Sequence, residues 1–189
     1  MPLTRINNQS LANVTSAGLP TGTVLQMKSA VQDGDLSGNG TSIDVLTLTI
    51  TPSSTSSTIF LMSHAQCSAT ERYHHCKLYR KIGNGNYIQI AKGDNSSQST
   101  RQAGWYTFGT RNTSGATYTQ DNGAGFFLDT PATTSQLTYK ITIGITDTAG
   151  TTAYDFSVNA SHYEHFTSAQ NAFWNTFPIT TLSAMEVAG

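Results

Sequence analysis

Short stretches of alternating apolar and polar residues, separated by turns rich in Gly, Ser, Asn and Pro, constrain this 189-residue chain more than any other feature. Polar residues alternate along IDVLTLTI (43–50), and LTYKITIGI (137–145) alternates throughout, so each stretch offers one face to a core. The tetrapeptide GNGN (83–86) favours a tight hairpin, because Gly and Asn tolerate positive φ. The chain is therefore predicted to be all-β, an antiparallel, jelly-roll-like β-sandwich of about nine to eleven strands.

The other strands are expected between turn signals such as residues 52–57 (PSSTSS). Their predicted ranges are 22–31, 58–67, 73–80, 87–91, 104–109, 126–128, 152–158 and 179–187. The run TIFLMSHAQC at 58–67 begins almost continuously apolar, which favours a strand buried on both faces. Residues 33–44 are interpreted as a polar loop, and residues 93–124 as long loops around one or two strands.

The first 21 residues differ from the rest, because their apolar residues are isolated in a polar Asn, Ser and Thr stretch. These apolar residues are Leu3, Ile6, Leu11 and Val14. Gly18 and Pro20 would end any helix there. We predict an extended N-terminal arm at 1–21 that anchors the chain on another subunit, followed by a β-sandwich domain at 22–189; a frayed terminus is the alternative.

Composition excludes several classes of protein. The net charge is −1 and the ten Lys and Arg are scattered, so no nucleic-acid partner is expected. No apolar run approaches the ~20 residues that span a bilayer, so membrane insertion is not expected, and the N-terminus lacks the apolar core of a signal peptide. Cys67 and Cys76 are predicted to be reduced thiols, although facing positions in a hairpin would allow a bridge.

No known catalytic motif occurs, and nothing in the spacing brings two carboxylates together, so neither an enzyme nor a cofactor is predicted. Oxygen-bearing side chains in residues 33–44 follow calcium-loop spacing, but the last position is Asp and flanking helices are missing. These weak candidates are Asp33, Asp35, Ser37 and Asp44. A second group has no standard zinc spacing and consists of His64, Cys67, His74, His75 and Cys76. A third group, His162 and His165, would suit a metal-binding or pH-sensing role. Because all three groups are weak candidates, we predict that the protein binds no metal.

Aromatic residues in polar loops are the more informative signal, because stacking combined with hydrogen bonding recognises sugars and proteins. The candidate receptor- or partner-facing residues are Trp105, Tyr106, Tyr118, Phe173 and Trp174. The alternative is that these side chains close the ends of the sandwich or pack in a subunit interface.

Several short sequence segments, taken together and in this order along the chain, carry a resemblance to a known family. They are LTRINNQSL (3–11), TSAGLP (15–20), GTVLQ (22–26), ITPSSTSS (50–57), FLDTPATT (127–134) and MEV (185–187). In this respect the chain resembles small virion structural proteins, of tail-fibre type, from environmental and marine tailed bacteriophages. The resemblance spans the whole chain and implies a β-sandwich, homotrimers and no catalytic residues.

The sequence is therefore interpreted as a phage virion structural protein, tail-fibre or receptor-binding in type, that acts by multivalent, non-catalytic binding. Its expected partners are further copies of itself, other virion proteins through the arm, and a host surface glycan or protein. Its expected location is the virion, assembled in the host cytoplasm. A head-fibre or capsid-decoration protein is the first alternative, and a carbohydrate-cleaving depolymerase the second.

Overall fold

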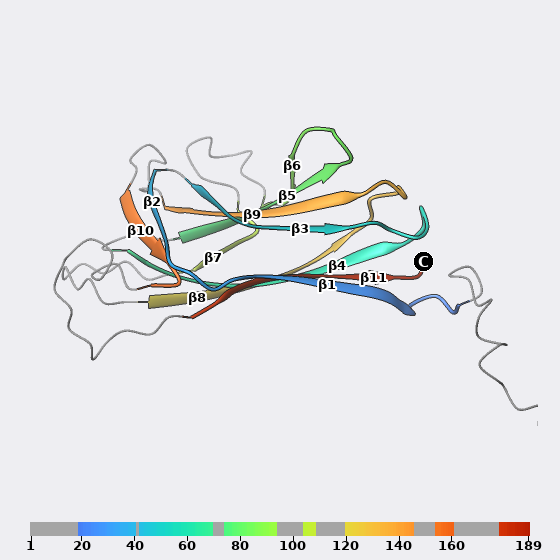
Figure 1. Cartoon of the computed structure of the whole chain (residues 1–189), viewed down its shortest axis with the longest axis horizontal. Helices are drawn as coiled ribbons and strands as arrows, with labels where there is room; N and C mark the ends of the chain where they lie inside the picture. The colour runs from blue at the N-terminus through green and yellow to red at the C-terminus, as the bar shows by residue number, and fades with distance from the viewer. Residues whose placement is uncertain are drawn as a thin grey trace, which may run out of the picture.

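The computed structural model describes residues 19–40, 42–69, 74–93, 104–108, 120–145, 154–160 and 178–189 (Figure 1). These residues form strands and turns and contain no helix. The strands are β1 (Val24–Gln32), β2 (Leu36–Gly40), β3 (Ile43–Ile50), β4 (Thr58–Ala69), β5 (His74–Ile82), β6 (Ile88–Ala91), β7 (Tyr106–Phe108), β8 (Gln120–Asp129), β9 (Leu137–Ile145), β10 (Tyr154–Val158) and β11 (Thr180–Val187).

The strands form two antiparallel sheets that pack face to face (Figure 1). Sheet A follows the order β1-β11-β4-β10-β2, with β8 paired to the other edge of β4, and sheet B follows β3-β9-β5-β6, with β7 paired to β5. Strands β3, β4 and β5 lie alternately in sheets B, A and B, as β7, β8 and β9 do. This crossing between layers is jelly-roll-like, and it confirms the predicted all-β antiparallel sandwich.

The core lies between the inner faces of the sheets, where the alternation of the sequence places the apolar side chains. In β9, Leu137, Tyr139, Ile141 and Ile143 are fully buried and alternate with outward-facing residues. Sheet A contributes buried residues from β4, β10 and β11, among them Ile59, Leu61, Phe156 and Leu182. Each large apolar side chain buried in this way contributes about 1.5–3 kcal/mol to folding.

A polar cluster joins the two sheets inside the sandwich. The Arg80 guanidinium of β5 donates to Asp129 Oδ1 at the end of β8 over 2.6 Å, and the Tyr139 hydroxyl of β9 donates to Asp129 Oδ2 over 2.7 Å. Burial raises the pKa of Tyr139, and the hydrogen bond to Asp129 adds to that effect. The cluster therefore fixes the edge strand of sheet A to the two central strands of sheet B.

Two sequence predictions are wrong in this structure. Strand β4 is not buried on both faces: Ile59, Leu61, Ser63 and Ala65 are buried, while Phe60, Met62 and His64 are half-buried or exposed on the outer face. Residues 33–44 are not one polar loop, because 36–40 form β2, which pairs with β10. The partner strand decides this, since Gly38 lies against the Phe156 ring, where a Cβ would come within 2.5 Å.

The ends of the described chain meet at one end of the sandwich. Gly22 donates its backbone N–H to the Ala188 carbonyl over 2.8 Å, and Ala188 donates to the Thr23 carbonyl over 2.8 Å. The predicted anchor residues lie outside the described residues, and the division at residue 21 stays a prediction. Within the described ranges, no helix has the length and apolar character needed to cross a membrane.

Candidate interaction surface

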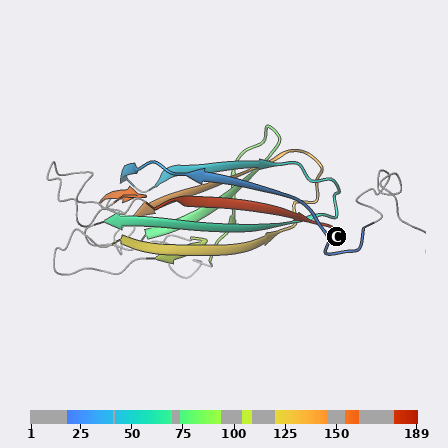
Figure 2. The same ribbon diagram turned by 60° about the horizontal axis from the view of Figure 1, so that its bottom comes forward.

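The outer face of sheet A is the largest candidate site. Strands β8, β4, β11 and β1 lie side by side (Figure 2), and their registers align outward-facing side chains in rows across the sheet. The first row is Met27, Met185, Phe60 and Leu128, and the second is Ser29, Ser183, Met62 and Phe126. The third row is Val31, Thr181, His64 and Ala124, and Val24 and Val187 stand beside the first row at its other side. We call these residues the apolar face.

Large side chains of the apolar face are open to solvent. Phe126 is 66% exposed and Leu128 56%, both on β8, while Met27 is 53% and Val31 54% exposed on β1. The Phe60 and Phe126 rings stack with their centroids 6.2 Å apart. None of the outward-facing residues described on these four strands is Asp, Glu, Lys or Arg. The rows on these four strands cover roughly 500 Å². Ser29, Ser183, Thr181 and His64 occupy part of that area. The largest apolar patch of a typical monomer is roughly 300–600 Å² and is often functional.

Side-chain size differs along the second row of the apolar face. Met62 and Phe126, on β4 and β8, are large, whereas Ser29 and Ser183, on β1 and β11, are small. The two serine hydroxyls hydrogen-bond each other over 3.0 Å. The first row is large on all four strands, because Met27 and Met185 lie beside Phe60 and Leu128.

Two predicted aromatic residues support strands β4 and β8 from the inner side. Trp105 and Tyr106 are half-buried, pack against the core, and contact each other edge-on at 5.3 Å. Trp105 Nε1 donates to the Phe126 carbonyl over 3.3 Å, and the Tyr106 and Ser63 hydroxyls hydrogen-bond over 3.1 Å. A Cβ at Gly125 would come within 2.4 Å of the Tyr106 ring. These contacts match the alternative in which the aromatics close the sandwich, and a receptor-facing role stays a prediction.

The other predicted site residues do not meet in the described structure. Tyr118, Phe173, Trp174, His162 and His165 lie outside the described residues, as the predicted anchor does. Among the described residues, no three His, Cys, Asp or Glu side chains are placed to hold a metal ion. Ser37 is in β2 opposite Ser157, and Asp44 is 3.0 Å from the Lys140 ammonium. Asp33 and Asp35 precede β2, and they form no cation site with Asp44.

The two cysteines are free thiols in the core, one in each sheet. Burial raises the pKa of Cys67, and it raises the pKa of Cys76 to about 12. Both thiols are therefore protonated at neutral pH, which makes them poor nucleophiles and poor metal ligands.

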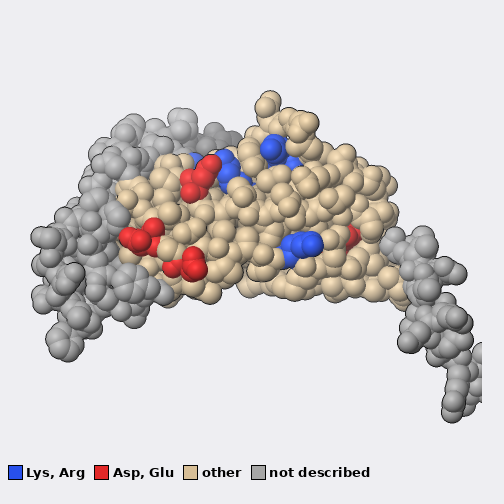
Figure 3. Space-filling model, in the orientation of Figure 1, with Lys and Arg blue, Asp and Glu red and all other residues tan. Residues whose placement is uncertain are grey.

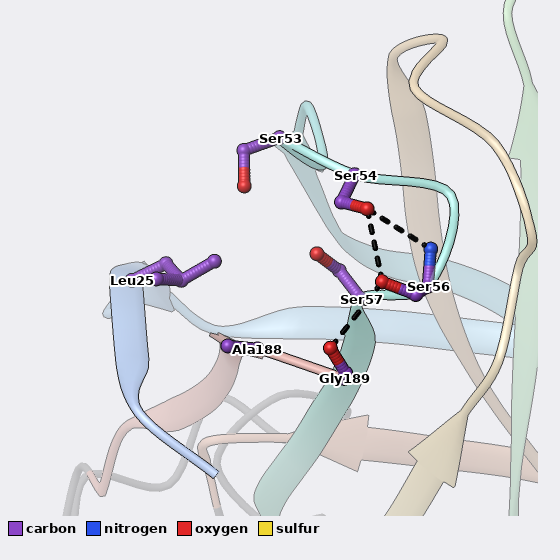
Figure 4. Close-up of a pocket in the computed structure, with 7 residues that line it drawn as sticks. All are labelled: Leu25, Ser53, Ser54, Ser56, Ser57, Ala188 and Gly189. Carbon is purple, nitrogen blue, oxygen red and sulfur yellow. Dashed lines mark hydrogen bonds between the residues drawn. The ribbon is translucent and has the colours of Figure 1, made fainter. Parts of the chain in front are cut away.

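A pocket of about 420 Å³ lies at the end of the sandwich where the described chain begins and ends (Figure 4). Its lining residues are Leu25, Ser53, Ser54, Ser56, Ser57, Ala188 and Gly189. The serines bond mainly within the chain: the Ser54 and Ser56 hydroxyls are 2.9 Å apart, and Ser56 donates to the Gly189 carbonyl over 3.4 Å. The lining hydroxyls are therefore engaged mainly in hydrogen bonds within this turn, and they are not a set of donors aimed at a ligand.

Glu186 holds this turn in place. It is buried, and its Oε1 accepts hydrogen bonds of 2.7 Å from the Ser53 amide, the Ser53 hydroxyl and the Ser57 hydroxyl, while Oε2 accepts one of 2.6 Å from Gln26. Burial disfavours the charge, but these hydrogen bonds outweigh it and lower the pKa of Glu186. The carboxylate therefore fixes the end of β11 to the turn before β4.

The outer face of sheet B is polar by contrast. Its outward residues on β5 and β9 include Lys77, Tyr79, Lys81 and Lys140. The Lys140 ammonium lies 4.5 Å from the centre of the Tyr87 ring and 5.6 Å from that of Tyr79. Figure 3 shows that charged side chains on the visible surface are few and separated by uncharged residues. Charge thus marks one sheet's outer face and not the other's.

Sequence reasoning missed the apolar face, although part of its signal is present. Phe60 and Met62 alternate with the buried Ile59 and Leu61, so a reading of residues 58–67 by period two would have placed them outward. The pairing of β8 and β1 with their neighbours, which gathers Phe126 and Met27 onto the same face, comes only from the topology.

These features define the class of protein: an all-β, two-sheet antiparallel sandwich with an uncharged apolar outer face. No protein-family model matches the chain, and no curated protein matches it.

Three similar solved structures are viral. The structure of the Gx strain of infectious bursal disease virus has a TM-score of 0.39 and 11% identity, covering 88% of this chain and 39% of that chain. The Gt strain structure has a TM-score of 0.41 and 12% identity, covering 87% and 40%. The crystal structure of the virus's VP2 subviral particle has a TM-score of 0.38 and 10% identity, covering 87% and 40%. The chain thus spans about two fifths of those chains, and similarity at this level carries no information on function.

Proposed function

We propose that this chain is a virion structural protein of phage tail-fibre type, which assembles as a homotrimer and acts by multivalent, non-catalytic binding. The single observation that carries the proposal is the exposed, uncharged apolar face of sheet A, because a surface of this kind is stable in water when another protein covers it. The resemblance of the sequence phrases to phage virion proteins sets the class of assembly.

A non-enzymatic role agrees with the chemistry of the described residues. The buried thiols are protonated. Glu186 accepts hydrogen bonds from the serines of a turn, and Asp129 accepts them from Arg80 and Tyr139. These groups are occupied within the fold, which favours binding over catalysis. The N-terminal arm is proposed to dock the trimer on other virion proteins, while exposed loops contact a host surface glycan or protein.

Gold-labelled antibody against the protein, applied to purified phage particles and imaged by electron microscopy, tests the proposal. Label along the tail supports the tail-fibre form, and label on the shell supports the head-fibre or capsid-decoration form instead. Particles without label, from a lysate in which the protein is abundant, would exclude both. Release of reducing sugar from host polysaccharide by the purified protein would favour the depolymerase.

A further inference from the structure

We infer that the free edge of β8 takes up an extended segment of a different protein, which adds to sheet A as a further strand. The inference goes beyond the proposed function and does not depend on it. Strand β8 is the yellow strand at the margin of sheet A (Figure 2); it pairs with β4 over its whole length, and no described strand pairs with its other edge. Such an edge presents a row of backbone N–H and C=O groups, and the backbone of another strand is the partner that matches their spacing.

The other edge strands in the described part of the chain each have a feature that discourages pairing. Strands β2, β6 and β7 are short, with five, four and three residues. Strands β1 and β3 are longer, but each has a register shift near its beginning. Strand β1 also carries Lys28 on the side of the buried Ala184, so its charge points inward at the edge. Short length, irregular register and inward-pointing charge are the devices by which sheets prevent their edges from pairing with other chains.

Strand β8 has none of these features. It is ten residues long, its register with β4 is regular, and it contains no Pro, Lys or Arg. Its central segment GAGFFL (123–128) carries no charge. Asp129, at its end, is bound by Arg80 and Tyr139 inside the sandwich and does not guard the edge. Among the described strands, β8 is therefore the long edge that is left open to pairing.

The surroundings of this edge leave room for a strand on its outer side. Trp105 lies on the inner side of β8, against Gly125, and donates its indole N–H to the Phe126 carbonyl over 3.3 Å. Trp105 belongs to neither β4 nor β8, so this bond shows that a donor from outside the pair reaches the backbone of β8. A single indole N–H satisfies one acceptor, whereas a row of peptide groups would satisfy every second residue of the strand.

The side chains of β8 specify which kind of segment fits. Phe126 and Leu128 point to the outer side and are 66% and 56% exposed. On the paired edge of β8, Met62 and Phe60 of β4 lie opposite these two residues, and the Phe60 ring stacks on Phe126. Cross-strand pairs of large apolar side chains stabilise a sheet. A segment on the free edge is therefore expected to be uncharged in its centre and to carry large apolar residues at alternate positions.

Charge favours a different chain over a second copy of β8. In the antiparallel register that pairs residues 121–129 of two copies, Asp121 of each copy would lie opposite Asp129 of the other. In a parallel pairing, each Asp would lie beside its counterpart. Like charges that face each other destabilise a strand pair. A different segment with Lys or Arg at its two ends would instead bring cations near these carboxylates.

Binding of a synthetic peptide to the full chain tests the inference. The peptide copies TIFLMSHAQ (58–66), the sequence that β8 already pairs with, and has blocked ends and two added lysines on each side. Titration calorimetry is expected to show saturable binding below roughly 1 mM peptide. Amide hydrogen exchange in β8 is expected to slow about tenfold or more at saturation, while exchange in β1 stays unchanged.

A pair of variants separates edge pairing from contact with the apolar face. Ala124→Lys places a charge at the exposed centre of β8 and is expected to raise the dissociation constant of the peptide about tenfold or more. The matched control, Ser29→Lys, places the same charge at an exposed position of the same outer face, on β1, and should bind the peptide as the wild type does. If Ala124→Lys unfolds, Leu128→Lys replaces it at a second exposed position of β8.

Three results would overturn the inference. They are no binding at 1 mM peptide, equal weakening by Ala124→Lys and Ser29→Lys, and slow exchange of β8 in the wild type without peptide, together with a mass above that of the 20.2 kDa chain that falls in Ala124→Lys. The last result would assign the edge to a second copy. None of these outcomes bears on the proposed function, which depends on where the labelled protein lies on the particle.

Discussion

Both sheets alternate inward-facing and outward-facing residues along their strands, but their outer faces differ in the side chains that they expose. On sheet B, Lys and Tyr side chains point into water, and Lys140 is paired with Asp44. On sheet A, the corresponding positions hold Phe60, Met62 and Met185, with Ser and Thr between them. Since the inner faces of both sheets are equally buried, folding of the isolated chain does not explain the difference. The difference supports the proposal that sheet A contacts another protein while sheet B faces solvent.

The two faces also differ in how they are held. Residues of the sheet B face contact one another, as in the approach of Lys140 to the Tyr79 and Tyr87 rings. The apolar face is supported from behind, by Trp105 and Tyr106 against β8 and by Asp129 at the end of that strand. Its edge strand is therefore expected to be sensitive to changes in the core.

The largest effect is expected from Asp129→Ala, which removes the acceptor of Arg80 and Tyr139 and leaves a guanidinium in the core. Loss of one partner of a buried ion pair costs about 3–5 kcal/mol. We expect that loss in the free energy of unfolding measured in urea, together with faster hydrogen exchange in β8 than in β9.

The matched control is Asp44→Ala, which breaks the exposed ion pair with Lys140 on the sheet B face. An exposed pair of this kind contributes about 0–1 kcal/mol, so this variant should remain close to the wild type. Equal losses for the two variants would mean that the sheets are not joined through Asp129 as described.

A smaller effect is expected from Glu186→Gln, which tests the inner side of β11 behind Met185 and Val187. The amide cannot accept from all of the Ser53, Ser57 and Gln26 donors, and a buried donor left unpaired costs about 1–3 kcal/mol. The folded pKa of Glu186 lies below its ordinary value of 4.5, so the charged carboxylate stabilises the fold above that pH. This stabilisation is lost as the pH falls through the folded pKa.

Urea unfolding at about pH 7 and at lower pH values, down to about pH 3, measures both parts of this prediction. The wild type should lose more stability on acidification than the variant, so the two curves converge at low pH. Parallel curves of stability against pH would show that Glu186 is not charged in the folded protein. In a separate measurement, an oligomer mass equal to that of the wild type would show that the apolar face tolerates a change on the inner side of β11.

The fold was largely predictable because its signals are local. Residues 43–50 and 137–145 form β3 and β9 with the predicted bounds, and Gly83 in the predicted hairpin has a φ of 51°. Strand β2 was missed, because a Gly, Ser and Asn segment has little preference for a strand until β10 pairs with it. The start of β8 was missed for the same reason, since its residues 120–124 (QDNGA) include no large apolar side chain and pair with β4.

The candidate surface was not predicted, because exposure is a property of the assembled sheet. Phe126 and Phe127 are neighbours of equal hydrophobicity, yet one is 66% exposed and the other packs on the core. The sequence shows that one of the two must point outward, but the face that it joins depends on pairing with a strand some sixty residues earlier, around Met62. Trp105 and Tyr106 show the same dependence on topology, since their polar neighbours in the sequence suggest open loops while both rings pack against the core.

The smallest effect is expected from Lys140→Met, which sharpens the contrast between the faces. The change keeps an unbranched apolar stem while removing the ammonium from Asp44 and from the Tyr79 and Tyr87 rings. An ion pair with an exposed carboxylate and two cation–π contacts at a partly exposed site together contribute about 1 kcal/mol, and the ion-pair part falls with added salt. The free energy of unfolding should drop by that amount at low salt and by less at high salt, with the oligomer mass unchanged. A shift in mass would place the sheet B face in a subunit contact, and the division of the molecule into a solvent face and a protein face would then fail.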